Sequence, residues 1–167
     1  MKRFSHLAFL LLLFFTFVPA QQTKQHPATY VDKGACPFEC CTYRQWTANT
    51  AITLWDRPKG TRVGGSLHKG QIVQGLTGEV WSTPLPVKSD RDIPETAIKA
   101  GDTFYALHYD GEGNWKVWFR GALILVNDTV INIPDTHAEW WVQIKDTGGN
   151  VGWAISRRNF DHQDACE

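Results

Sequence analysis

Four cysteines constrain the fold of this chain most strongly, because Cys36, Cys40 and Cys41 lie close together near the start and Cys166 is the penultimate residue. Neighbouring Cα atoms lie about 3.8 Å apart, whereas disulfide-bonded Cα atoms usually lie about 4.4–6.8 Å apart, which disfavours a Cys40–Cys41 bridge. We therefore expect Cys166 to pair with one residue of the early group and the other two to close a small local loop. Such a long bridge joins both ends of the chain and typically contributes about 2–4 kcal/mol.

The first twenty residues have the pattern of a secretory signal peptide. A basic start, MKRFSH, precedes the apolar run LAFLLLLFFTFV, and the small residue Ala20 stands before Gln21. The run is shorter than the roughly 20 residues that span a bilayer, which favours cleavage over an uncleaved anchor. We expect a secreted or periplasmic protein whose cysteines are oxidised, so a catalytic or metal-binding thiol is disfavoured.

The charges of the chain are balanced and dispersed. The whole sequence has 17 Lys and Arg against 17 Asp and Glu, and it contains no basic cluster longer than Arg157-Arg158. Nucleic acid and anionic membranes are therefore not expected partners. The part that follows the signal peptide is long enough for one domain or two closely joined small ones.

Short apolar runs separated by turn residues follow a polar lead-in over residues 21–34, which we expect to be flexible. Helical periodicity is almost absent, and Lys69-Gly70 has the chemistry of a turn between strands. Residues 101–126 are typical of a strand, a Gly-rich turn and two further strands. Residues 89–101 are expected to form a long loop with room for one helical turn. The pattern predicts an all-β fold, a small barrel or sandwich.

A weak internal repeat relates residues 114–119, NWKVWF, to residues 139–144, EWWVQI. Trp115 aligns with Trp140, and large apolar residues follow at the second and fourth positions after each. Residues two apart in a strand point to the same face, so this face of each copy is expected to be core. Trp153 is also expected to point inward.

The opposite, otherwise polar face of each copy carries one tryptophan, Trp118 in the first and Trp141 in the second. Either the two units pack against each other through these side chains, or the side chains are exposed and stack on a ligand. Both readings remain open from the sequence.

Residues 51–78, with LWDRPKG and GSLHKGQIV, and residues 139–155, with WWVQIKDTGGNVGWAI, resemble the bacterial SH3-type domain. The resemblance implies an SH3-like barrel over residues 35–167, interrupted by an insert of about residues 79–138 that forms a second, degenerate SH3-like unit. It also implies a non-enzymatic module in the bacterial envelope that binds cell-wall peptidoglycan or a peptide or protein partner.

Five residues are candidates for the ligand site. Trp55 and Asp56 begin a loop where SH3-type domains commonly gather ligand contacts, and exposed aromatic side chains can stack on sugars or extended peptide. The complete set is Trp55, Asp56, Tyr105, Trp118 and Trp141.

Enzyme and metal sites are not expected. Residues 110–114, DGEGN, begin like a calcium loop, but Trp115 stands at its sixth position and Gly121 at its twelfth, so a hairpin turn is the better interpretation. The histidines are scattered singly, and His108 is expected to be an ordinary strand residue. Two alternatives are kept: a small envelope hydrolase or inhibitor acting through residues 89–101, and a structural subunit that packs on another protein through Trp118 and Trp141.

Overall fold

The computed structural model describes residues 25–166, so the signal-peptide prediction lies outside the described residues. All regular elements in this range are strands, which confirms the all-β prediction. The strands are β1 (Tyr30–Lys33), β2 (Gln45–Ala48), β3 (Ile52–Trp55), β4 (Val63–Leu67), β5 (Ile72–Ser82), β6 (Leu85–Lys88), β7 (Thr103–Gly111), β8 (Asn114–Phe119), β9 (Ala122–Asn127), β10 (Ala138–Asp146), β11 (Val151–Ile155) and β12 (Phe160–Asp161). Within residues 25–166, no helix has the length and apolar character needed to cross a membrane.

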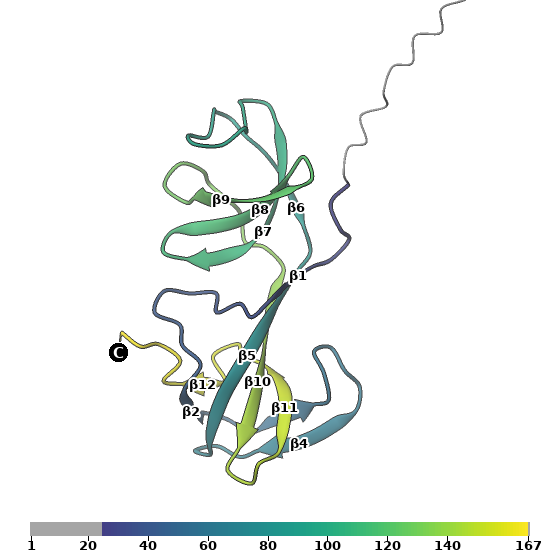
Figure 1. Cartoon of the computed structure of the whole chain (residues 1–167), viewed down its shortest axis with the longest axis vertical. Coiled ribbons are helices and arrows are strands. Elements are labelled where there is room, and N and C mark those ends of the chain that lie inside the picture. Colours follow the sequence, from purple (N-terminus) through teal and green to yellow (C-terminus); the bar gives the residue numbers. More distant parts are fainter. Residues whose placement is uncertain (1–24, 167) are drawn as a thin grey trace, which may run out of the picture.

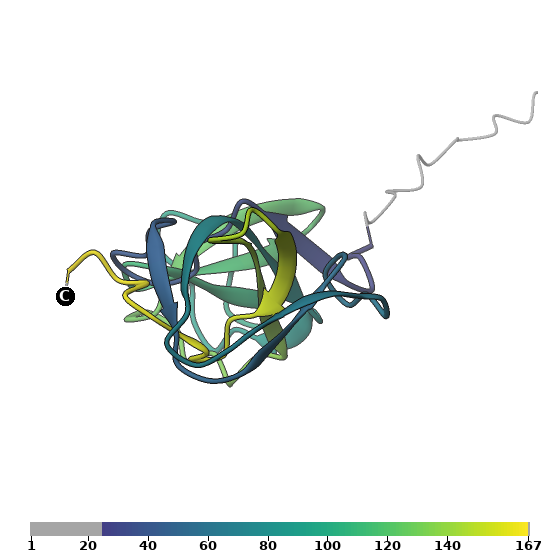
Figure 2. The same ribbon diagram turned by 90° about the horizontal axis from the view of Figure 1, so that it is seen from below.

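The first sheet curls on itself in the order β12-β2-β5-β10-β11-β3-β4 (Figures 1 and 2). Its central pair is β5 and β10, which are antiparallel from Ala138 opposite Ser82 to Asp146 opposite Val73. The far end of β5 also pairs with β1. The two distant sequence fragments therefore meet in one sheet, as predicted.

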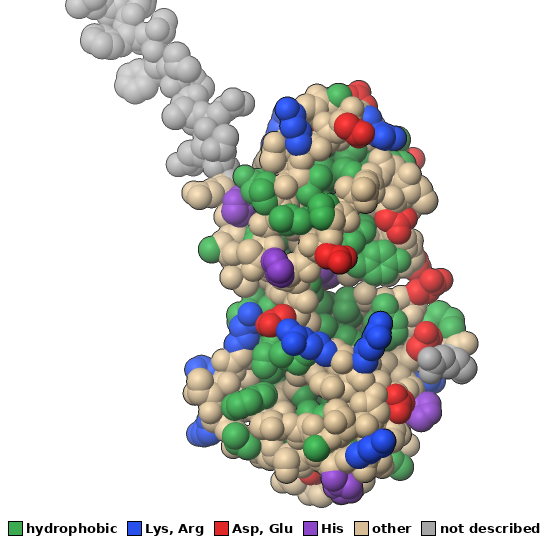
Figure 3. All heavy atoms as spheres, turned by 180° about the vertical axis from the view of Figure 1, so that it is seen from behind, with side chains coloured by type: hydrophobic (Ala, Val, Ile, Leu, Met, Phe, Trp, Pro, Cys, Tyr) green, Lys and Arg blue, Asp and Glu red, His purple; other side chains and the backbone are tan. Residues whose placement is uncertain are grey.

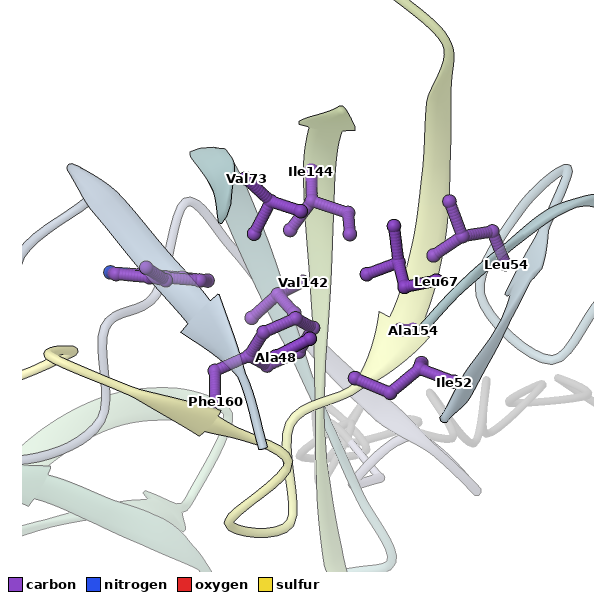
Figure 4. Packing of buried hydrophobic residues seen from close by; sticks show 10 residues of the cluster. Ala48, Ile52, Leu54, Leu67, Val73, Val142, Ile144, Ala154 and Phe160 are labelled. Atoms are coloured by element: carbon purple, nitrogen blue, oxygen red, sulfur yellow. The ribbon is translucent and has the colours of Figure 1, made fainter. Parts of the chain in front are cut away.

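The inner face of this sheet encloses the first core. Trp46 and Val142 are fully buried, and side chains from β2, β3, β4, β5, β10, β11 and β12 converge there (Figure 4). The members are Trp46, Ala48, Ile52, Leu54, Leu67, Val73, Val142, Ile144, Ala154 and Phe160.

The second sheet is an antiparallel meander, β6-β7-β8-β9, formed by the chain between β5 and β10. It makes a separate lobe above the first sheet (Figure 1). Its core consists of Ile93, Ile98, Phe104, Ala106, Val117, Phe119 and Val126. The interrupted architecture, one curled sheet with a second β unit emerging from it, matches the predicted fold class.

The repeat assigns the inward faces correctly. Val117 and Phe119 belong to the second core with Trp115 packed against it, and Val142 and Ile144 belong to the first core with Trp140 packed against it. The prediction for Trp153 is wrong. Leu54 packs so close to Gly152 that a Cβ there would lie 2.8 Å from the Leu54 Cβ, so β11 turns its small residues inward and Trp153 outward.

Two other local predictions differ from the structure. Residues 30–33, expected to be part of a flexible lead-in, form β1, because their backbone pairs with residues 79–82 of β5. Residues 89–101 form turns without a helix. In that loop, Asp92 accepts hydrogen bonds from Lys99 Nζ at 3.2 Å and from the Ala100 N–H at 3.0 Å.

The disulfide prediction is confirmed. Cys36 pairs with Cys41 and closes a local loop, and Cys40 pairs with Cys166 across a sequence separation of 126 residues. Two disulfides indicate folding in an oxidising compartment.

Gly78 of β5 provides a test of the packing around the first core. An added Cβ would collide with the Tyr43 hydroxyl and Trp140 Nε1, and would lie 2.9 Å from the Ala35 carbonyl oxygen. Burial raises the pKa of Tyr43 to about 12, so its hydroxyl stays protonated and donates to that same carbonyl.

Gly78→Ala is expected to lower the free energy of unfolding by about 1–3 kcal/mol through overpacking. Urea unfolding measures this change. Gly64→Ala is the control, because the nearest atom to its added Cβ lies at an ordinary 3.6 Å. Equal effects of the two substitutions would contradict the packing argument.

Candidate functional site

The outward face of the first sheet carries four tryptophans, which we call the outer tryptophan face: Trp55, Trp81, Trp141 and Trp153. Trp55 of β3 lies directly opposite Trp153 of β11. On the neighbouring strands, Glu139 of β10 lies opposite Trp81 of β5, and Trp141 lies opposite Glu79. Residues two apart share a face, so the register alone places these aromatic groups on one side of the sheet.

A cluster of ion pairs borders this face. Glu139 accepts from Lys59 Nζ at 2.9 Å and from Arg157 at 3.5 Å. The Lys59 ammonium also lies 5.7 Å from the centre of the Trp81 ring, within the range of a cation–π contact. Trp141 Nε1 donates to Glu139 at 3.4 Å. The hydrogen bond from Lys59 holds the pKa of Glu139 below its ordinary value against the opposing effect of burial, so the carboxylate is charged at neutral pH.

Two loops with left-handed residues position the cations. Lys59 has φ of 55° in the loop between β3 and β4, which is closed by hydrogen bonds from the Asp56 N–H to Arg62 and from the Gly60 N–H to Arg57. Arg157 has φ of 26° in the turn that follows β11. Such conformations cost residues other than glycine about 1 kcal/mol or more, and they cluster at functional sites.

A cavity of about 320 Å³ opens beside the ion pairs, and Lys59, Trp81, Ser82, His137, Glu139 and Arg157 are among its lining residues. Ser82 is fully buried, and its Oγ has no hydrogen-bond partner among the described residues. Basic and hydrophobic side chains lie next to each other at the waist between the lobes in the view of Figure 3. The arrangement offers aromatic surface together with charges of both signs.

The five residues proposed from the sequence fall into two groups. Trp55 and Trp141 are on the outer tryptophan face, with Trp141 only 6% exposed, and Asp56 lies in the adjoining loop, paired with Arg62 at 3.4 Å. Tyr105 and Trp118 face each other across β7 and β8 in the second sheet. The His26 ring packs on Tyr105 with 3.9 Å between ring centres.

Sequence reasoning missed four residues of the site: Lys59, Trp81, Glu139 and Arg157. Trp81 could have been found, because it lies two residues after Glu79 in a strand and therefore shares the outward face of that charged residue. The others come together only through the β5–β10 register and the two loops, so no local pattern in the sequence marks them.

A second group of charged side chains lies between the lobes. Asp32 of β1 accepts from His108 Nε2 at 3.0 Å and from Lys116 Nζ at 2.6 Å, and Lys116 also contacts Asp110 at 2.7 Å. Asp32, His108 and Asp110 are close enough to hold a metal ion, but the Lys116 ammonium already lies against both carboxylates. We therefore assign this cluster a structural role. Cys40, Asp164 and Cys166 also lie close together, but both thiols are consumed by the disulfide.

Another cavity, of about 680 Å³, lies near the C-terminal segment and is lined by Trp140, Ser156, Arg158, Asp161 and His162, among others. Ser156 is buried, and its Oγ hydrogen-bonds with the side chain of Gln163 at 3.0–3.2 Å. The serine hydroxyl is thus engaged by an amide rather than by a base that could activate it.

No protein-family model, curated protein or solved structure matches this chain.

Proposed function

We propose that this protein is an exported, non-enzymatic binding module of the bacterial SH3 type that binds cell-wall peptidoglycan on its outer tryptophan face. The observation that carries the proposal is the meeting of that face with the Lys59–Glu139–Arg157 ion pairs beside one cavity. Peptidoglycan combines sugar rings with short peptides that carry carboxylates and amines. Flat indole surfaces can stack on the sugar rings, and paired cationic and anionic side chains can bind the carboxylates and amines of the peptides.

The SH3-type assignment is supported by the way in which the two resembling fragments meet. Residues 51–78 supply β3, β4 and most of β5, and residues 139–155 supply most of β10 and β11, in one curled sheet. The ligand-lining loop that the resemblance implies, beginning at Trp55 and Asp56, is the loop that places Lys59 over Trp81.

The hydrolase alternative has less support. Its carboxylates would come from the loop at residues 89–101, where the Ala100 N–H and then Lys99 hold the pKa of Asp92 below its ordinary value. A general acid requires a raised pKa so that it keeps its proton near neutral pH. Asp90 is likewise engaged, by Arg91 at 2.9 Å.

Co-sedimentation with purified peptidoglycan tests the proposal. Trp81→Ala removes the ring beneath Lys59, and we expect at least about tenfold weaker retention, equivalent to about 1.4 kcal/mol. Lys59→Ala should weaken retention in the same direction. Soluble wall fragments that carry the peptide should compete for binding.

Trp118→Ala is the matched control, because it removes an indole from the second sheet and leaves the outer tryptophan face intact. Thermal unfolding of each variant separates loss of binding from loss of fold. Failure of the unsubstituted protein to sediment with the wall, or an equal loss with Trp118→Ala, would reject this function.

A further inference from the structure

The strand β9 is an edge strand that lacks the usual protection. Its sequence, ALILVN, contains no charged residue, proline or glycine. The other strands with a free edge differ: β6 contains Pro86 and Lys88, β4 has a register shift typical of a bulge, β12 is two residues long, and β1 contains Asp32 and Lys33. Proteins normally protect edges with such features, because an unprotected apolar edge pairs with another strand.

The hairpin geometry determines which backbone groups of β9 remain free. A two-residue turn, Arg120-Gly121, with φ of 48° and 88°, joins Phe119 to its partner Ala122. In such a turn the flanking pair is hydrogen-bonded, and hydrogen-bonded and non-hydrogen-bonded pairs then alternate. The register runs to Asn127 without a bulge. Ala122, Ile124 and Val126 therefore bond to β8, and the N–H and C=O groups of Leu123 and Leu125 point to the free edge.

The side chains at the same positions are exposed. Leu123 is 45% exposed and Leu125 is 53% exposed, whereas Val126 of the same strand is buried. Leu123 lies beside Trp118, and Leu125 lies beside Lys116, on the outward face of the second sheet. Unpaired backbone groups and apolar side chains thus occur together.

We propose that β9 pairs antiparallel with β9 of a second copy of this chain, joining the two second sheets into one continuous sheet. A two-fold axis beside Ile124 places Leu123 of one copy opposite Leu125 of the other. The outward N–H of each of these residues can then donate to the outward C=O of the other. Closed two-fold contacts of this kind use the same patch on both partners.

The charges at the ends of β9 favour a second copy over an unrelated strand. The same axis brings the end of one copy that carries Arg120 next to the end of the other copy that carries Asp128. No like charges face each other along the pair, because ALILVN is uncharged. The Arg120 side chain is 68% exposed beside Asp102, so it is accessible to a second carboxylate.

The contact is small, since one short strand from each copy forms it, and interfaces below about 1,200 Å² in total are generally weak or transient. Association should therefore depend on concentration, with dimer accumulating between about 10 μM and 1 mM.

Sedimentation equilibrium of the mature, oxidised protein across that range tests the proposal. Leu125→Lys places a charge on the edge without removing a hydrogen bond to β8, and the dissociation constant is expected to rise at least about tenfold. Val63→Lys is the control, because Val63 is a 60% exposed apolar residue in β4, an edge strand of the other sheet, and its replacement should leave association unchanged.

Amide hydrogen exchange locates the contact. Exchange of the Leu123 and Leu125 amides should slow as protein concentration rises, whereas the Ile124 and Val126 amides should be protected at every concentration. A chain that remains monomeric at 1 mM, or a dimer whose association is unchanged by Leu125→Lys, would overturn the proposal. Peptidoglycan retention is measured separately, so either idea can fail without the other.

Discussion

Asp32→Asn is expected to lower the free energy of unfolding by about 2–3 kcal/mol near neutral pH, because it removes the anion that accepts from both His108 and Lys116. The Asp32 side chain is 15% exposed and His108 is 2% exposed, so water replaces little of what is lost. His108 Nδ1 lies 2.7 Å from the Tyr109 carbonyl oxygen, and Nε2 lies 3.0 Å from Asp32.

The pH dependence of this effect follows from the Asp32 pKa. The hydrogen bond from His108, with a smaller contribution from Lys116, holds this pKa below its ordinary value despite burial. A carboxyl group with a lowered folded-state pKa contributes stability above its unfolded pKa of about 3.9, and that contribution is lost as the pH falls through the folded value. The difference between the unsubstituted protein and Asp32→Asn should therefore shrink as the pH falls from about 5 to about 2.

Urea unfolding across this pH range measures the effect. Asp90→Asn removes the same charge from an exposed pair with Arg91, so it should change stability little at any pH. A difference between Asp32→Asn and the unsubstituted protein that stays constant down to pH 2 would mean that packing, rather than charge, causes the loss.

Because Asp32 lies in β1 while His108, Asp110 and Lys116 lie in β7 and β8, this network links the first sheet to the second. The lead-in was the least informative part of the sequence. Its four-residue strand has no apolar alternation, and its stability comes from pairing with β5 and from a carboxylate whose partners lie more than 70 residues away. Local sequence rules do not detect interactions of that kind.

Where apolar and polar residues alternate strictly along a strand, the sequence alone is enough to assign the residues that point into the core. In NWKVWF and EWWVQI, only one face of each strand is apolar throughout, so the inward residues could be assigned. In VGWAI both faces contain apolar residues, and the choice between them depends on Leu54 of another strand, so Trp153 was assigned to the wrong face. The short strands β2, β6 and β12 were missed for the same reason, because distant partners determine them.

In the candidate site, too, residues marked by a local pattern can be predicted from the sequence, whereas residues brought together by distant partners cannot. Trp55, Asp56 and Trp141 were suggested by local pattern and resemblance, and they lie on or beside the outer tryptophan face. Glu139 and its partners could not be linked in advance, because Lys59 and Arg157 reach it from loops on opposite sides of the insert. The site is thus a product of the long-range β5–β10 pairing.

Loss of the Cys40–Cys166 disulfide is expected to have the largest effect of any change considered, about 3–5 kcal/mol on the free energy of unfolding. Closing a loop with a sequence separation of 126 residues removes far more freedom from the unfolded chain than closing one with a separation of 5. The chain-entropy relation gives about 5 kcal/mol for the long bridge and about 2 kcal/mol for the Cys36–Cys41 bridge.

The folded state should survive this loss, because other bonds hold the C-terminal segment in place. Arg44 donates to the carbonyl oxygens of His162 and Asp164, the Thr42 N–H bonds to Gln163 at 3.0 Å, and the Ala165 N–H bonds to Cys40 at 2.8 Å. Replacing Cys40 and Cys166 together with serine should therefore leave the near-ultraviolet circular dichroism spectrum close to that of the unsubstituted protein while the urea midpoint falls. The control replaces Cys36 and Cys41 in the same way and should cost less than half as much. If the two double variants lost equal stability, the bridges would act through local packing in the folded state rather than through the freedom of the unfolded chain.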